Sequence, residues 1–97
     1  MSVFLIIEIQ VRDEILYSQY VERVPAVVGR YGGRYLARGG TVTPLAGGWN
    51  PERIIVIEFE SVARVQQCFA SPEYLELAPL REQSTASRVI LVEGCAF

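Results

Sequence analysis

Four segments of the chain read as β-strands, and most of them are apolar on both faces. They cover residues 2–11, 33–38, 53–60 and 87–93. Side chains of a strand alternate between the two faces of a sheet, so a sheet with one face in water would show apolar and polar residues in turn. Here the second face is apolar too. In a chain of 97 residues, with few helices to cover it, we expect a second copy of the same sheet to do so.

The segment after the first strand has the spacing of an amphipathic helix. Asp13 is a suitable N-cap, and apolar residues then recur in steps of three and four as far as Tyr31. Pro25 lies inside this pattern and predicts a kink or a short break near it. Gly32-Gly33 ends the helix, with one glycine in the left-handed conformation. The expected inward stripe is Leu16, Tyr20, Val24, Val27 and Tyr31.

A second helical region follows the third main strand and is expected in two pieces. Ser61 caps a short helix. Ser71 restarts a helix, because it is a cap residue followed by Pro72 at the first helical position and by Glu73 near the positive end of the helix dipole. The last strand comes next.

The element order β-α-β-β-α-β predicts an α+β domain over residues 1–97. Gly39-Gly40 predicts a hairpin, and Thr41 to Leu45 a short return strand at the sheet edge. Right-handed crossovers then give a four-stranded antiparallel sheet with both helices on one face. We expect the first and third main strands to be central, adjacent and parallel to each other. Two such sheets packed face to face would form a dimeric α+β barrel.

Composition narrows the function classes. The net charge of −2 provides no basic field for nucleic acid or an anionic membrane, and no apolar run is long enough to span a bilayer. The chain has no His and no Lys, which removes the usual general base, metal ligand, haem ligand and Schiff-base amine. Two cysteines, without a metal-ligand spacing or an export signal, favour a cytoplasmic protein with reduced thiols. We expect neither a metal nor a cofactor.

Several motifs resemble a known family. They are Gly32-Gly-Arg-Tyr-Leu-Ala-Arg-Gly-Gly40, Trp49-Asn-Pro51, Glu58-Phe59, Ser71-Pro-Glu-Tyr74 and Arg88-Val-Ile-Leu-Val-Glu-Gly94. Their order and spacing resemble the uncharacterised family named domain of unknown function 1330. The resemblance implies a ferredoxin-like member of the dimeric α+β barrel superfamily, which includes cofactor-free monooxygenases, small isomerases, lactonases, haem-dependent enzymes and binding modules. It implies no specific activity, and the absence of His argues against haem chemistry and His-based proton transfer.

Two carboxylates are the candidates for catalysis. Glu58 follows four apolar residues in a central strand, and Glu8 occupies a similar place late in the neighbouring strand. Two carboxylates on adjacent strands can raise one pKa and so create a general base. The alternative is that each carboxylate forms an ion pair with Arg34 or Arg38 from the second strand.

Arginine and aromatic side chains are the candidates for substrate binding. Arg38 and Arg34 are expected on one strand face, where they could clamp a carboxylate or enolate or pair across strands with glutamate. Trp49, the one tryptophan, would close a pocket or contact a partner subunit. Tyr20 and Tyr74 are either core residues or the walls of one cleft between sheet and helices.

Three functions remain open at this point. One is a small cofactor-independent enzyme of isomerase, lyase or monooxygenase type, acting on a carbonyl or carboxylate metabolite. Another is a non-catalytic ligand-binding module, and the last is a structural dimer. A cavity of a few hundred cubic ångströms with at least one Arg and one Glu in its wall would favour the first two.

Overall fold

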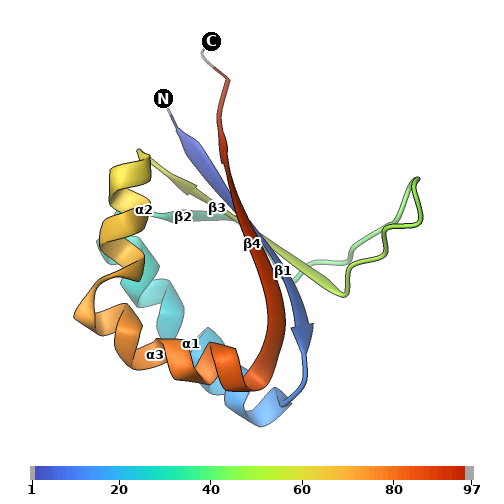
Figure 1. The fold of residues 1–97 in the computed structure, drawn as a ribbon, viewed down its shortest axis with the longest axis horizontal. Helices are drawn as coiled ribbons and strands as arrows, with labels where there is room; N and C mark the ends of the chain where they lie inside the picture. Colours follow the sequence, from blue (N-terminus) through green and yellow to red (C-terminus); the bar gives the residue numbers. More distant parts are fainter. Residues whose placement is uncertain (1, 96–97) are drawn as a thin grey trace.

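The computed structural model describes residues 2–95 and shows one four-stranded sheet with three helices (Figure 1). The elements are β1 (Val3–Val11), α1 (Glu14–Arg30), β2 (Arg34–Arg38), β3 (Arg53–Phe59), α2 (Val62–Phe69), α3 (Pro72–Ser84) and β4 (Thr85–Glu93). The strand order is β2-β3-β1-β4, and every neighbouring pair is antiparallel. The helices cover one face of the sheet. The predicted βαββαβ order, with the second helix in two pieces, is confirmed.

The direction of the central strands differs from the prediction. The first and third main strands, β1 and β3, are central and adjacent, but they run antiparallel, with Phe4 opposite Glu58 and Glu8 opposite Ile54. The crossover through α1 returns the chain in its original direction, and the connection from β2 to β3 then reverses it. The prediction that β1 and β3 are parallel was therefore wrong.

The connection between β2 and β3 is a loop over residues 39–52 with no strand in it. Gly39, Gly47 and Gly48 have positive φ angles, and Pro44 cannot donate a backbone hydrogen bond. The expected return strand over Thr41 to Leu45 does not form. The loop extends from the sheet away from the helical layer (Figure 1), and Leu45 is 93% exposed.

The predicted caps begin all three helices. Asp13 accepts a hydrogen bond from the Leu16 backbone N–H at 3.1 Å, and Ser71 accepts one from the Tyr74 N–H at 3.1 Å. The Ser61 hydroxyl caps α2 in the same way, at 3.2 Å. Each cap satisfies one of the N–H groups that the first helical turn leaves without a partner.

Helix α1 continues through Pro25 as one element, so of the predicted kink or short break, the break does not occur. The helix ends as predicted, because Gly32 has a φ of +82°. The following Gly33 approaches the core closely: a Cβ at this position would lie 2.5 Å from Val28 Cγ1 and 2.8 Å from Phe59 Cζ. The Gly-Gly pair therefore serves both the turn and the packing of α1 on the sheet.

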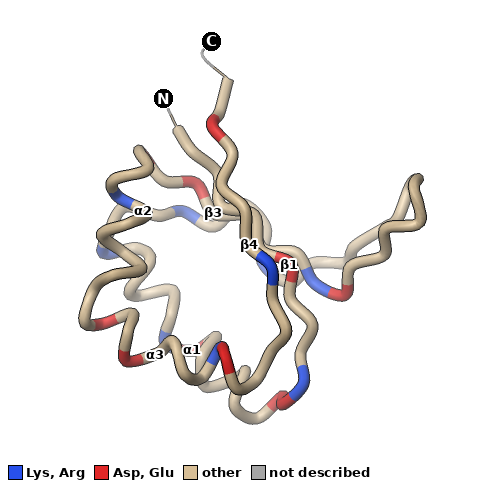
Figure 2. The backbone as a smooth tube through the Cα atoms, in the orientation of Figure 1, with Lys and Arg blue, Asp and Glu red and all other residues tan. Residues whose placement is uncertain are grey.

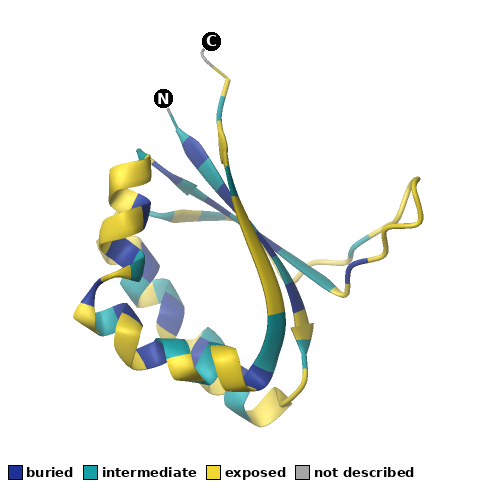
Figure 3. Cartoon of the chain, viewed as in Figure 1, coloured by how far each residue is buried: buried dark blue, intermediate teal, exposed yellow. Residues whose placement is uncertain are grey.

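The core lies between the helices and one face of the sheet (Figure 3). The sheet contributes the odd-numbered residues of its central strands, whose side chains point toward the helices: Val3, Leu5, Ile7, Ile9, Ile55, Ile57 and Phe59. Helix α1 contributes Tyr17, Tyr20, Val24 and Val28. Tyr20 and Val24 were predicted in the inward stripe, whereas the predicted Leu16, Val27 and Tyr31 are only half-buried.

The other face of the sheet carries no helix and is largely apolar. We call it the helix-free face; its apolar side chains are Phe4, Ile6, Ile54, Val56, Ile90 and Val92. Ile90 is 58% exposed and Val92 is 44% exposed. This confirms the apolar second face that the sequence pattern indicated. Within residues 2–95, no helix is long and apolar enough to cross a bilayer.

Candidate functional site

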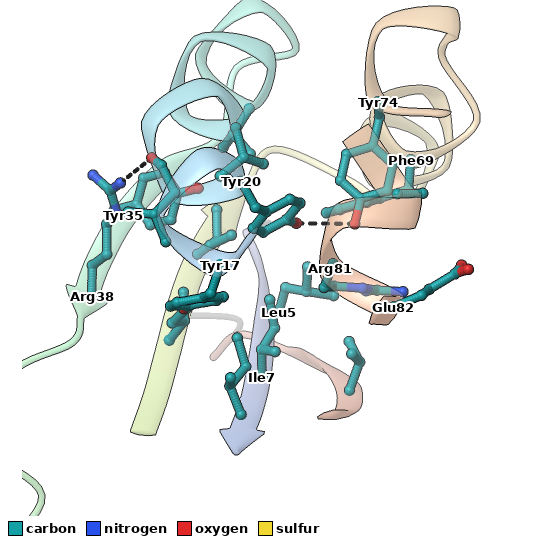
Figure 4. A pocket seen from close by; sticks show the side chains of 18 of the residues that line it. Leu5, Ile7, Tyr17, Tyr20, Tyr35, Arg38, Phe69, Tyr74, Arg81 and Glu82 are labelled. Carbon is teal, nitrogen blue, oxygen red and sulfur yellow. Dashed lines mark hydrogen bonds between the residues drawn. The ribbon is translucent and has the colours of Figure 1, made fainter. Parts of the chain in front are cut away.

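A pocket of about 500 Å³ lies between the sheet and the helices α1 and α3 (Figure 4). Its floor is the helix-facing side of β1 and β3, and its walls include Tyr17, Tyr20 and Tyr74. Most of the lining is apolar. Arg38, Arg53, Arg81 and Glu82 are the charged residues in the wall. The predicted cavity with Arg and Glu in its wall is therefore present, in the predicted layer.

Arg38 and Arg53 lie next to each other at one end of this pocket. Arg38 is opposite Ile55 in the ladder between β2 and β3, and Arg53 precedes Ile55 by two residues, so the two arginines share the helix-facing side. Arg38 donates a 2.7 Å hydrogen bond from Nη2 to the Val21 carbonyl, and its Cζ lies 5.1 Å from the centroid of the Tyr35 ring. One guanidinium is thus held by α1 and by an aromatic face.

Arg53 is held by close packing and lacks a full set of partners. Its Cζ lies 5.3 Å from the centroid of the Tyr17 ring. Its Nε is buried and has no hydrogen-bond partner among the described residues. Gly39, with φ +78°, leaves space for the guanidinium, since a Cβ there would collide with Nη2. Sequence and backbone geometry together bring a cationic group to the edge of an apolar pocket.

Arg81 contributes a third guanidinium from α3. Figure 4 shows it with Glu82 on the far side of the tyrosines from Arg38. The Arg81 Nε is also buried without a hydrogen-bond partner in the described part of the chain. The salt bridges among residues 2–95 involve Arg30, Arg34 and Arg88, and none involves a pocket arginine. The pocket therefore holds three guanidinium groups and one carboxylate.

Two tyrosine hydroxyls meet across the pocket. Tyr20 on α1 and Tyr74 on α3 lie with their hydroxyl oxygens 3.0 Å apart, and only 7% and 3% of the two residues is exposed (Figure 4). Burial, followed by the Tyr74 hydroxyl, raises the pKa of Tyr20 above its ordinary value. Burial also raises the pKa of Tyr35 to about 12. The hydroxyls of Tyr20 and Tyr35 therefore stay protonated and can donate hydrogen bonds.

The two predicted catalytic carboxylates lie outside this pocket. Glu8 and Glu58 have the parity of the helix-free face, and the antiparallel register separates them by four positions along the strands, about 13 Å. Their expected juxtaposition does not occur. Glu58 Oε1 pairs with Arg34 Nη2 at 2.6 Å, as the ion-pair alternative predicted. Glu8 pairs with Arg88 of β4 instead of with Arg34 or Arg38 (Figure 2).

The environment of Glu58 does not favour a general base at neutral pH. Hydrogen bonding from the Ser2 side chain and then from Arg34 lowers the pKa of this carboxyl group. A general base for neutral pH needs the opposite shift. Among residues 2–95, Glu82 is thus the one carboxylate in the pocket wall, and the sequence pattern did not indicate it.

Arg34 and Arg38 lie on opposite faces of the sheet, against the expectation that they share one. A bulge between Tyr35 and Ala37 inserts Leu36 as an extra residue in β2. Arg34 therefore lies opposite Glu58 on the helix-free face, whereas Arg38 is opposite Ile55 and reaches the pocket. Alternation alone assigns residues four apart to one face, so the sequence pattern could not show this.

Trp49 also lies away from the pocket. It is 57% exposed, and its indole Nε1 donates to Glu8 Oε2 at 3.4 Å. A second hollow of about 560 Å³ lies nearby, and Glu8, Arg88 and Glu52 are in its polar lining. The Glu8–Arg88 pair cancels two of these charges and leaves the single negative charge of Glu52. Of the seven predicted site residues, the structure brings three together in the helix-covered pocket: Arg38, Tyr20 and Tyr74.

The described residues include no cluster of metal ligands, and they contain two free cysteines, of which Cys68 is buried and Cys95 exposed. No group of three or more potential metal ligands occurs within residues 2–95. Cys68 is buried, and burial raises the pKa of its thiol to about 11. It is a core residue. Arg53 and Tyr17 are among the pocket residues that the sequence reasoning missed, as are Arg81 and Glu82; Arg53 has the parity of Ile55 and Ile57, which could have identified its face.

Sequence comparison places the chain in a family. The family model described as Domain of unknown function (DUF1330) matches residues 2–95, so the chain belongs to this family. This confirms the resemblance found in the sequence motifs. No curated protein sequence matches the chain.

Solved structures share the fold at low sequence identity. RPA0582, a protein of unknown function from Rhodopseudomonas palustris, is 20% identical, with a TM-score of 0.83, covering 97% of this chain and 82% of that one. SnoaB, a cofactor-independent oxygenase from Streptomyces nogalater, is 14% identical, with a TM-score of 0.71 and coverage of 99% and 95%. A dimeric protein of unknown function with a ferredoxin-like fold, from Bacteroides fragilis, is 14% identical, with a TM-score of 0.67 and coverage of 96% of each chain. The fold of this chain is ferredoxin-like.

Proposed function

We propose that the chain binds a small, mostly apolar molecule with one anionic group in the pocket between sheet and helices. The observation that carries the proposal is the charge of this pocket: three arginines line it, none of them in a salt bridge among the described residues, against one carboxylate. Guanidinium groups bind carboxylates through short, charge-assisted hydrogen bonds. An anionic ligand beside Arg38 and Arg53 would have two guanidinium groups within reach, and the Arg53 Nε has no partner among the described residues.

The size and lining of the pocket support the same class of ligand. Its volume of about 500 Å³ lies within the range of small-molecule sites, roughly 300–1,000 Å³. The apolar floor of β1 and β3 offers contact to a ring or a short chain, and the arginines lie at its margins. Such a site takes an organic acid in preference to a sugar or a free inorganic ion.

The test uses 2-naphthoate and the neutral 2-ethylnaphthalene in isothermal titration calorimetry. We expect the acid to bind about tenfold more tightly, because a hydrogen bond to a charged group contributes about 1.5–3 kcal/mol. Arg53→Gln should remove most of this preference. Arg30→Gln is the matched control, since Arg30 pairs with Glu73 at 3.1 Å outside the pocket. Equal affinity for the two compounds, or no binding of the acid at millimolar concentration, would contradict the proposal.

A second candidate is a cofactor-independent enzyme acting on a small carbonyl or carboxylate metabolite. It is favoured by the neutral tyrosine hydroxyls inside an apolar pocket, and SnoaB shows that this fold occurs in a cofactor-independent oxygenase. Arg38 would hold the anion in such an enzyme. Glu8 and Glu58, proposed for proton transfer, would have to act on the helix-free face, because neither lines the pocket.

Solvent exchange separates the two candidates. In D₂O, an enzyme that forms an enolate would catalyse deuterium uptake at the methyl group of 6-acetyl-2-naphthoate, which NMR can follow. If the bound compound exchanges deuterium at the same rate as in buffer alone, the enzyme is excluded and the binding module is supported.

We also propose that two copies associate through their helix-free faces. The face is apolar at its centre, and its charged residues are already paired as Arg34–Glu58 and Arg88–Glu8. Apolar centres with paired charges are typical of stable protein interfaces. The Bacteroides relative described above is dimeric, which supports the proposal.

A further inference from the structure

We infer that the Tyr20–Tyr74 hydroxyl pair binds a carbonyl oxygen of the ligand. The ligand is then a keto acid, with an anionic group at Arg38 and Arg53 and a neutral carbonyl at the tyrosines. The inference rests on the proposed binding function and adds the class of ligand to it.

The Tyr20–Tyr74 pair has one hydroxyl proton that the bond between the two oxygens does not use. Each phenol has one O–H, and the single hydrogen bond between the two oxygens, at 3.0 Å, uses one of the two protons. The other O–H has no acceptor within the part of the chain that the structure describes. Both residues are more than nine-tenths buried and line the pocket. A buried donor without a partner is costly, so this proton is available to a ligand.

The tyrosine pair favours a neutral carbonyl oxygen over a carboxylate oxygen as its acceptor. Tyr20 is a neutral phenol, and burial raises its pKa further, so its hydroxyl stays protonated and offers an uncharged donor. A neutral carbonyl accepts such a hydrogen bond and costs much less to desolvate than a carboxylate. The carboxylate of the same ligand has the arginines as stronger partners. The arginines therefore bind the carboxylate end of the ligand, and the tyrosine pair binds its carbonyl end.

The spacing of the two sites fits a compact ligand. The Arg53 Cζ lies 5.3 Å from the Tyr17 ring centroid, and that centroid lies 6.3 Å from the centroid of the Tyr20 ring. Tyr17 therefore connects the anion site to the tyrosine pair. A molecule of one or two rings, with a carboxylate at one end and a carbonyl at the other, is long enough to reach both.

The experiment compares 6-acetyl-2-naphthoate with 6-isopropenyl-2-naphthoate, in which a CH₂ group replaces the carbonyl oxygen with little change of shape. We expect calorimetry to show about fivefold tighter binding of the acetyl compound to the unmodified protein, the effect of one net hydrogen bond. The double variant Tyr20→Phe/Tyr74→Phe should bind both compounds with equal affinity. It should fold, because replacing both partners of a buried hydrogen bond by apolar groups of the same shape is nearly neutral.

Tyr31→Phe is the matched control, since the Tyr31 hydroxyl donates to Glu73 at 3.1 Å rather than into the pocket. It should keep the preference for the acetyl compound. Equal affinities in the unmodified protein, or a preference that survives in the double variant, would overturn the inference while leaving the anion site intact. If neither acid binds, or if Arg53→Gln binds both acids as well as the unmodified protein does, the proposed function itself fails.

Discussion

Both faces of the sheet carry arginine, but within residues 2–95 these arginines form salt bridges only on the helix-free face. On the helix-free face, Arg34 and Arg88 each pair with a glutamate from a neighbouring strand. On the helix-facing side, Arg38 and Arg53 have no salt bridge among residues 2–95. Charges that are neutralised within one chain suit a surface that another protein covers. Charges left open inside an apolar pocket suit a site that a small anion fills.

A single inserted residue creates part of this difference. Leu36 forms the bulge in β2, and Arg38 therefore faces the pocket while Arg34 faces the other way. Without the bulge, alternation would place both arginines on the helix-free face, with Arg38 opposite Ile54. The bulge thus supplies the pocket with a cation that the strand pattern would otherwise place on the helix-free face.

The largest expected effect is loss of association when the helix-free face gains a charge. Ile90→Asp would bury a carboxylate in the proposed interface, where burial of an unpaired charge is costly. We expect the dissociation constant of the dimer to rise about a hundredfold or more, which corresponds to about 3 kcal/mol. Light scattering combined with size exclusion over a concentration series measures it.

Ile15→Asp is the control for this prediction, because Ile15 is 75% exposed at the beginning of α1 and lies outside both faces of the sheet. It should leave the mass unchanged. A monomer for the unmodified chain at micromolar concentration would refute the proposed sheet-to-sheet dimer.

In the pocket we expect a smaller effect, in which a substitution raises the stability of the protein. Arg53→Met removes a guanidinium whose Nε is buried without a partner and keeps much of the apolar stem. We expect the free energy of unfolding to rise by about 1 kcal/mol, because the cost of the unsatisfied donor disappears. Urea unfolding of the ligand-free protein measures it. Arg34→Met should lower stability or leave it unchanged, and a loss of stability in Arg53→Met as large as in Arg34→Met would erase the distinction between the two faces.

The smallest effect concerns the pH dependence of the pair between Arg34 and Glu58. The pKa of Glu58 is lowered in the folded protein from an ordinary value of 4.5. The pair therefore contributes stability above that pH and loses it as the pH falls through the folded value. Thermal unfolding of the unmodified protein and of Glu58→Gln should differ most near pH 7 and converge in acid. Glu60→Gln, at an exposed position, is the control, and a difference that grows in acid would contradict the sign.

Local rules of sequence predicted most of the fold. The caps at Asp13, Ser61 and Ser71 and the turn at Gly32 act over a few residues, and the structure confirms each of them. The apolar second face followed from alternation alone. The strand direction did not, because alternation is the same whichever way a strand runs. The expected return strand was wrong because a Gly-Gly pair marks a turn and leaves the conformation of the next residues undetermined.

The site was less predictable than the fold. Tyr20, Tyr74 and Arg38 were found, since helix spacing and a strand end indicated their positions. Glu8 and Glu58 were misplaced relative to each other, because closeness across a sheet depends on strand direction. Arg81 and Glu82 reach the pocket from the end of α3; Arg81 has the helical spacing of Tyr74 and Leu77, but a charged residue does not stand out as part of an apolar helix face.

The position of Trp49 gives the protein a built-in optical probe. It is the one tryptophan of the chain, it lies at the helix-free face beside Glu8, and it does not line the helix-covered pocket. Indole emission shifts to shorter wavelength when water leaves its surroundings. Fluorescence on dilution should therefore follow the joining of two subunits without any label and remain silent to a ligand that enters between sheet and helices.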